Sequence, residues 1–179
     1  TKQVYFPQNH IWFDFYTDDM CPGGQKKNVT VSMESIPTFV RAGAFIPMAE
    51  LVQSTANYNL ENFDLHYYHD NSVEESERFI YNDDGYTMNA FEKGMYEKLF
   101  FEAEIEGSWL EIDFEAETGA NYKTKNKQIN LIVHNISWLP KTILASERCF
   151  DKRPFLCTSF KKAAIYFCDC PSVLVYSWS

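Results

Sequence analysis

The sequence is poor in glycine and proline, with seven of each among 179 residues. This scarcity excludes the collagen-like and low-complexity classes, in which these residues dominate. Basic residues are also few, since 16 Lys and Arg stand against 25 Asp and Glu, which gives a formal charge of −9. Because binding to a nucleic-acid backbone needs clustered Lys and Arg, this balance argues against DNA or RNA as a partner.

Long apolar runs are absent as well. No stretch approaches the ~18 consecutive apolar residues that indicate a membrane-spanning helix, so no membrane partner is expected. The chain does not begin with Met and opens without a charged-then-apolar leader. We therefore expect it to be a segment cut from a longer protein.

Cysteine is present in an odd number, with scattered spacing, and no histidine pair lies at metal-ligand spacing. We expect free thiols that are buried or half-buried, ordinary polar histidines, and no metal or other cofactor. The cysteines do not fix the compartment. They are Cys21, Cys149, Cys157, Cys168 and Cys170, and the histidines are His10, His66, His69 and His134.

What the sequence does have is aromatic residues, at 17% of the chain, and apolar residues that alternate with polar ones. Period two is typical of strands with one face in water, and turn residues separate these segments. The pattern predicts an all-β protein built as an antiparallel β-sandwich, with a partial second β-domain at the N-terminus. The alternating segments cover residues 28–33, 63–68, 101–106, 110–117 and 129–133.

A polar stretch around residues 53–62 divides the chain. We predict an incomplete β-domain over residues 1–60, which holds few strands for an independent core. Residues 61–179 are long enough for a complete sandwich.

One hairpin can be placed in register from the sequence alone. A two-residue loop at residues 107–108 stacks apolar on apolar, as a buried face requires. The same register sets acidic residues opposite one another, which costs roughly 0.2–1 kcal/mol per pair. The apolar pairs are Ile105 with Leu110, Ala103 with Ile112 and Phe101 with Phe114, and the acidic pairs are Glu104 with Glu111 and Glu102 with Asp113.

Something should compensate this repulsion. We expect Lys123, Lys125 and Lys127 to bring positive charge on a neighbouring strand. A divalent cation such as calcium is the alternative.

The densest carboxylate site is Asp83-Asp84-Gly85. It could bind a cation, but it lacks the spaced ligands and the distant Glu of a calcium-binding helix-loop-helix. A tight turn between two strands is the interpretation we favour, because Asp and Gly tolerate positive φ. Asp83 and Asp84 are therefore weak metal candidates, and Gly85 is a structural residue.

Aromatic side chains could stack on the apolar faces of sugar rings. In an aromatic-rich sandwich, however, most rings belong to the core or to interdomain contacts. The candidates for carbohydrate contact are Trp12, Tyr16, Tyr67, Tyr68 and Trp138.

Three motifs of the first fifty residues stand out: residues 12–17 (WFDFYT), the glycines at 23–24 and residues 36–48 (IPTFVRAGAFIPM). In order and spacing they resemble the pattern that follows the catalytic barrel in glycoside hydrolase family 31. Residues 81–87 (YNDDGYT) resemble its Y-x-D-D-G-x-T turn. Beyond about residue 100 only the strand pattern is similar.

The resemblance implies a parent enzyme that is a retaining α-glycosidase acting on α-glucosides or α-xylosides, with two catalytic aspartates in a (β/α)8 barrel. No residue here matches the barrel motifs, so no catalytic residue is assigned. The chain would be the end of the proximal C-terminal β-domain plus the distal β-sandwich. It would pack against the barrel of the same parent chain and could contact oligosaccharide. Arg41 for an interdomain hydrogen bond and Gly43 for a bend or bulge would be structural.

Two alternatives stay open. A carbohydrate-binding β-sandwich module would need a flat, exposed row of aromatics or a calcium loop. An enzyme in its own right would have to cleave an α-glucoside with these residues alone, which we do not expect. The sugar, the linkage and the oligomeric state do not follow from the sequence; for the parent, a periplasmic or secreted location is favoured.

Overall fold

The computed structural model describes residues 1–107, 109–136, 142–147 and 162–168. Its regular structure is almost entirely strands, with one 3-10 turn, η1 (Thr55–Asn57). No helix in these ranges is long and apolar enough to cross a membrane. The strands are β1 (Lys2–Phe6), β2 (Ile11–Asp14), β3 (Met20–Pro22), β4 (Gln25–Val29), β5 (Phe39–Arg41), β6 (Phe45–Ala49), β7 (Asn62–Tyr68), β8 (Glu75–Asp83), β9 (Tyr96–Glu106), β10 (Trp109–Thr118), β11 (Gln128–His134), β12 (Thr142–Glu147) and β13 (Lys162–Cys168).

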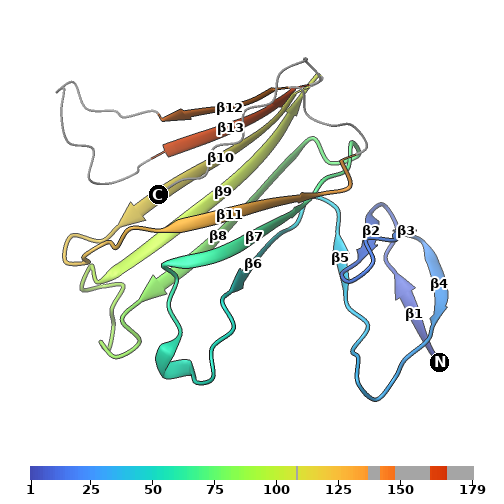
Figure 1. The fold of residues 1–179 in the computed structure, drawn as a ribbon, viewed down its shortest axis with the longest axis horizontal. Coiled ribbons are helices and arrows are strands. Elements are labelled where there is room, and N and C mark those ends of the chain that lie inside the picture. Colours follow the sequence, from blue (N-terminus) through green and yellow to red (C-terminus); the bar gives the residue numbers. More distant parts are fainter. Residues whose placement is uncertain (108, 137–141, 148–161, 169–179) are drawn as a thin grey trace.

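Two sheets overlie one another and form a sandwich (Figure 1). One sheet has five strands in the order β12-β13-β10-β9-β8, and the other has three in the order β11-β7-β6. The strand pairs of both sheets are antiparallel except for β7 with β11, which run parallel. The long crossover that a parallel pair requires is supplied by β8, β9 and β10. The predicted antiparallel β-sandwich is confirmed, with one parallel pair in addition.

The sandwich core lies between the two sheets and follows the period of two. In β9, Leu99, Phe101 and Ala103 point inward, whereas Glu102 and Glu104 point to solvent. Burying each large apolar side chain contributes roughly 1.5–3 kcal/mol, which makes this layer the main source of stability. The buried members are Phe45, Leu60, Phe63, Leu65, Tyr67, Leu99, Phe101, Ala103, Leu110 and Ile112.

The hairpin of β9 and β10 has the predicted register. Ile105 lies opposite Leu110, and Phe101 lies opposite Phe114. The acidic pairs also form as predicted, with Glu104 opposite Glu111. The alternation therefore sufficed to align these two strands.

The N-terminal residues form two small sheets beside one end of the sandwich (Figure 1). One pairs β1 with β4, and the other has the order β3-β2-β5. Their core is small and consists of Phe13, Val40, Ala42 and Tyr68. Tyr68 projects from β7 on the side away from the sandwich core, and its ring centroid is 5.9 Å from that of Phe13. The small sheets thus complete their core with a residue from the sandwich.

Strand β6 pairs with β7 across the predicted division at residue 60. The chain enters β6 through a turn at Gly43, whose N–H donates a hydrogen bond to the Tyr68 carbonyl at 2.7 Å. The last strand before residue 60 is therefore part of the larger sandwich. The division into residues 1–60 and 61–179 stays a prediction.

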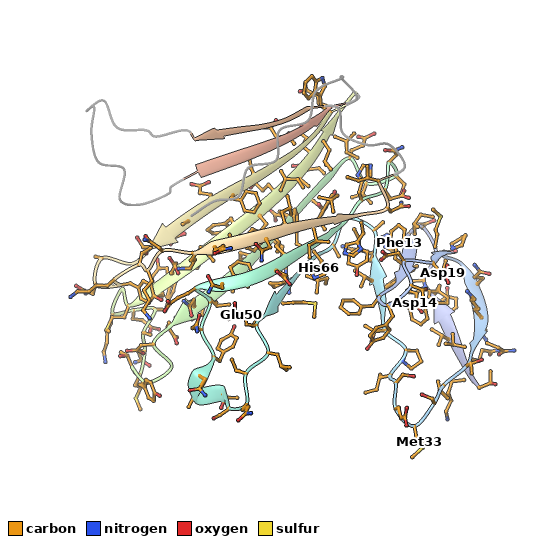
Figure 2. All side chains as sticks on the ribbon, viewed as in Figure 1. Phe13, Asp14, Asp19, Met33, Glu50 and His66 are labelled. Carbon is orange, nitrogen blue, oxygen red and sulfur yellow. The ribbon has the colours of Figure 1, made fainter. Side chains whose placement is uncertain are left out.

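The strand expected over residues 28–33 is shorter than predicted. Strand β4 ends at Val29, because Val29 lies opposite Lys2 at the start of β1 and the chain beyond it has no strand to pair with. Met33 is fully exposed in the loop that leads to β5 (Figure 2). The prediction of a strand that continues to Met33 is wrong.

Candidate functional site

The residues proposed for carbohydrate contact do not form one surface. Tyr67 and Tyr68 are 1% and 0% exposed, so neither ring offers a face to a ligand. Trp12 is half-buried, with its indole N–H donating to the Pro7 carbonyl at 3.3 Å. Tyr16 is exposed, and Trp138 lies outside the described residues.

The carboxylates of Asp83 and Asp84 accept hydrogen bonds from residues of the loop that follows them. Asp83 accepts from the Gly85 N–H at 2.8 Å. Asp84 accepts from the Thr87 hydroxyl at 2.6 Å and from the backbone N–H groups of Tyr86 and Thr87. These bonds, that of the Thr87 hydroxyl first, lower the pKa of Asp84 below its usual range. In the described ranges, no three His, Cys, Asp or Glu side chains are arranged to hold a metal ion.

The three residues proposed as structural differ in their surroundings. Gly43 adopts φ +77, and a Cβ there would lie 2.7 Å from Cγ1 of Val73. Gly85 adopts φ +70 with open space around it. The Arg41 side chain is exposed, and its interdomain hydrogen bond stays a prediction.

The outer face of the five-stranded sheet carries an acidic patch. β8 adds Glu75 opposite Glu104 and Glu77 opposite Glu102, so like charges face one another across three strands. Together they line a shallow depression. The acidic patch consists of Glu75, Glu77, Glu102, Glu104, Glu111 and Asp113.

The predicted lysine compensation of this patch is wrong. Lys125 pairs with Glu61, and Lys127 pairs with Glu97 at 2.6 Å. The reason is topological: the chain after β10 crosses to the other sheet, so these lysines never run beside the acidic patch.

The pair of Glu97 and Lys127 is buried. The Glu97 side chain is 1% exposed and that of Lys127 11%, and Glu97 also accepts from the Thr124 hydroxyl at 3.0 Å. Glu97 is in phase with Leu99 and Phe101 on the inward face of β9. That phase was visible in the sequence and could have identified Glu97 as a buried acid.

Two histidines and an aspartate form a chain of hydrogen bonds at the junction of the small sheets and the sandwich. Asp18 accepts from Nδ1 of His134 at 2.9 Å. In neutral His134 this leaves Nε2 as the acceptor for the Nδ1–H of His66, at 2.8 Å. Tyr68 stacks on His134 with ring centroids 4.2 Å apart. Figure 2 shows His66 on the sandwich and Phe13 on the small sheets, at the two sides of this junction.

The backbone turn at residues 14–18 places the Asp18 side chain beside His134. The Asp14 carboxylate accepts from the N–H groups of Tyr16 and Thr17, and Asp18 itself adopts φ +59. Burial, and next the neighbouring His134, lower the pKa of His66. The sequence predicted ordinary polar histidines here, because nothing in it shows that a loop 116 positions away in the sequence reaches β11.

A second cluster on the outer face of the five-stranded sheet is aromatic. Phe79 lies opposite Phe100 with ring centroids 5.8 Å apart, and the rings of Tyr81 and Tyr96 are inclined by only 15°. Phe91, from the loop between β8 and β9, contacts Tyr96 at 4.6 Å between centroids. We call these five residues the aromatic strip. The sequence prediction missed it, because it needs residues from two strands and a loop.

The N-terminal part matches a known domain family. Residues 1–46 match the glycosyl hydrolase family 31 C-terminal domain. An α-xylosidase from Saccharolobus solfataricus is 36% identical over 96 residues, 53% of this chain and 12% of that protein. Alpha-glucosidase 2 from Bacillus thermoamyloliquefaciens is 31% identical over 105 residues, 58% of this chain and 13% of that protein. The chain thus spans about an eighth of these relatives.

The fold also has solved counterparts. A family 31 dextranase from Flavobacterium johnsoniae, solved in complex with glucose, superposes with a TM-score of 0.76 at 21% identity. The match covers 93% of this chain and 24% of that one, and at this identity it shows the likeness of fold alone. With the motifs at residues 12–48 and 81–87, these findings support the interpretation of the chain as a C-terminal fragment of a family 31 glycoside hydrolase, with the family match itself confined to residues 1–46.

Proposed function

We propose that the chain is a non-catalytic accessory segment of a retaining α-glycosidase that hydrolyses α-glucosides or α-xylosides. The chemistry would take place in a (β/α)8 barrel of the same parent chain, where two aspartates act as nucleophile and as acid and base. The relatives that support this proposal are named as an α-xylosidase and an α-glucosidase.

The observation that carries the proposal is the number of large apolar side chains exposed in residues 1–60. The two small sheets share a core of only a few residues, while many large apolar side chains remain in solvent. Exposed apolar patches of this kind mark protein–protein or interdomain contacts. The exposed residues of the small sheets and their connections are Tyr5, Tyr16, Met20, Met33 and Ile36, and those of β6 and the segment that follows it are Met48, Leu51, Val52 and Tyr58.

The barrel is the partner that fits this surface. Residues 1–60 would be the end of the proximal domain and would bury these side chains against it. Residues 61–179 would be the distal sandwich, a rigid layer behind the proximal domain. The buried aromatic contact of Phe13 with Tyr68 would hold the small N-terminal sheets against the sandwich.

The proposal is tested by comparing two polypeptides. The chain alone and the longer polypeptide that its gene encodes upstream of Thr1 are assayed with 4-nitrophenyl α-glucoside and α-xyloside. We expect turnover only from the longer polypeptide. Replacing Met33 and Ile36 by Glu in it should lower its unfolding temperature, while the same change should leave that of the isolated chain unaltered, because both side chains are already exposed there.

Turnover by the 179 residues alone would contradict the proposal. A gene that encodes no barrel before Thr1 would also contradict it. The same holds if the two Glu substitutions leave the unfolding temperature of the longer polypeptide unchanged. Glu34→Gln, in the same loop, serves as the control for charge changes in that loop.

A further inference from the structure

The aromatic strip lies on β8, β9 and the loop between them, on the outer face of the five-stranded sheet and away from the sandwich core. Phe79, Phe91 and Tyr81 are 53%, 51% and 40% exposed, and Phe100 and Tyr96 are half-buried between them. The strip comes from two paired strands and one loop that packs on them, so the rings are held by a rigid scaffold. It presents ring surface to solvent.

One lysine lies among the rings of the strip. Lys98 lies 4.9 Å above the Phe91 ring and 5.4 Å from that of Tyr96, and it is 3.9 Å from the Glu117 carboxylate. Glu117 also accepts from the Tyr96 hydroxyl at 2.6 Å. The strip is therefore an aromatic surface whose rim carries one ammonium group, hydroxyl groups and several carboxylates, since Glu115 lies opposite Phe100 and Asp83 lies opposite Tyr96.

The acidic patch beside the strip disfavours anionic partners. The acidic patch lies directly beside the rings on the same face of the sheet. Glu77 is two residues from Phe79 on β8, and Glu102 is two residues from Phe100 on β9. Nucleic acids, acidic peptides and anionic lipid surfaces would be repelled by it. A ligand for the strip is therefore expected to be uncharged or basic, and of these an uncharged ligand with apolar faces and hydroxyl groups fits the rings and the polar groups of the rim.

We propose that the aromatic strip is a binding surface for a neutral oligosaccharide, namely an α-linked glucan chain. The apolar C–H faces of successive sugar rings would lie on Phe79, Tyr81 and Phe91, and their hydroxyl groups would donate to Glu117 and the tyrosine oxygens. This inference rests on the proposed function, since it supplies a glycosidase with a second place to hold its polymeric substrate.

The affinity should be low. A flat face buries less of a ligand than a cleft does, so a Kd on the order of 1 mM is expected. Weak binding of this kind would gain its effect from the length of a polymer, which can reach the strip and a catalytic domain together.

The test is a titration of the whole 179-residue chain with maltoheptaose and with isomaltotriose, followed by NMR chemical shifts. We expect shifts of the residues of the strip, with saturation in the millimolar range. The double variant Phe79→Ala, Tyr81→Ala should weaken binding at least about tenfold. The matched control is Tyr5→Ala, Tyr58→Ala, which removes two exposed aromatics outside the strip, one on β1 and one between β6 and β7, and should leave binding unchanged.

Both variants are checked for an unfolding temperature near that of the parent chain. If the double variant fails to fold, Phe91→Ala replaces it, because this side chain comes from a loop and is half exposed. Shifts that spread elsewhere, no saturation by either sugar, or equal affinity in the strip and control variants would overturn the inference. A monomer–dimer equilibrium abolished by Phe79→Ala would also overturn it and assign the strip to a second copy.

These outcomes are separate from those of the proposed function. Loss of sugar binding leaves the assay of the longer polypeptide untouched. Conversely, the 179-residue chain could both bind maltoheptaose at the strip and hydrolyse the α-glucoside. That result would support the binding surface and contradict the accessory role.

Discussion

The N-terminal sheets and the sandwich are both made of short strands, yet they use their side chains differently. In the sandwich each strand buries one face, so that Leu65, Phe101 and Ile112 are almost inaccessible to solvent. In the N-terminal part, Phe13 and Val40 are buried beside the fully exposed Met33. The comparison teaches that strand content does not make a domain: the sandwich has two layers around its core, whereas the small sheets borrow their second layer from a neighbour.

The largest expected effect sharpens this contrast. Phe101→Ala should destabilise the whole chain by about 3–5 kcal/mol, because it empties the centre of the two-layered core. Phe13→Ala should instead loosen the small sheets and leave the sandwich folded. Hydrogen exchange separates the two cases: protection of β7 and β9 falls in the first variant and is retained in the second. Equal loss in both would mean that the chain has a single cooperative core.

A similar loss is expected at the buried ion pair of the sandwich. Lys127→Met should cost about 3 kcal/mol, because the Glu97 carboxylate then lies buried without its partner. The double variant Glu97→Leu, Lys127→Met should recover most of that loss, since no buried charge remains. Urea unfolding measures both. The exposed pair is the control: Lys125→Met, which leaves Glu61 exposed to water, should cost less than about 1 kcal/mol.

The turn between the two regions should show an intermediate effect. Gly43→Ala is expected to cost about 2 kcal/mol or more, because φ is positive and the new Cβ would meet Val73 at 2.7 Å. Gly85→Ala is the matched control, with a positive φ but no neighbour, and should cost only about 1 kcal/mol. Equal losses in thermal unfolding would show that the Val73 contact relaxes freely.

The junction between the regions should respond to pH. The pKa of His66 is lowered in the folded chain, by burial first, so the unfolded state binds more protons below about pH 6.5. Stability should therefore decrease as pH falls from 7 to 5. The charged neighbours are Asp18, Asp64 and His134.

The measurement is the unfolding temperature of the parent chain and of His66→Gln between pH 5 and pH 8. The variant should lose part of the pH dependence. His69, whose pKa burial also lowers, supplies a dependence of the same sign, and His69→Gln separates the two. An unchanged slope in His66→Gln would show that the junction does not titrate in this range.

The smallest effect is expected on the acidic patch. Glu102→Gln together with Glu104→Gln should raise stability by roughly 0.2–1 kcal/mol, since each side chain faces like charges on both neighbouring strands. Glu115→Gln is the control, because Glu115 lies opposite Phe100. Calcium is titrated in parallel. A loss of calcium affinity in the double variant, in place of a gain in stability, would support the cation alternative.

Sequence reasoning succeeded where local pattern and global burial agree. The register of β9 with β10 followed from apolar alternation and a two-residue loop, since a slip by one residue would turn every apolar side chain to water. The turn residues Asp83-Asp84-Gly85 do end a strand, but the prediction of a second strand directly after them, over residues 86–88, is wrong, because β9 begins only at Tyr96. Cys21 is a buried free thiol, as expected.

It failed where contacts depend on distant segments. Tyr67 and Tyr68 alternate like one buried and one exposed residue, yet both are buried, because the N-terminal sheets cover the outer side of β7. The lysines at 123–127 were expected beside β10, but their segment crosses to β7 and Lys127 pairs with Glu97.

The sequence alone determined the all-β class, the strands with one wet face, and the resemblance to family 31, because each rests on neighbouring residues or on a linear motif. Only the tertiary structure decided which of the outward strand faces remain exposed to solvent and which are covered by other segments. It placed Asp18 against His134 and left Phe79, Tyr81 and Phe91 together on an open sheet. Periodicity states that a side chain leaves the core of its own sheet, but what it meets outside depends on segments a hundred residues away.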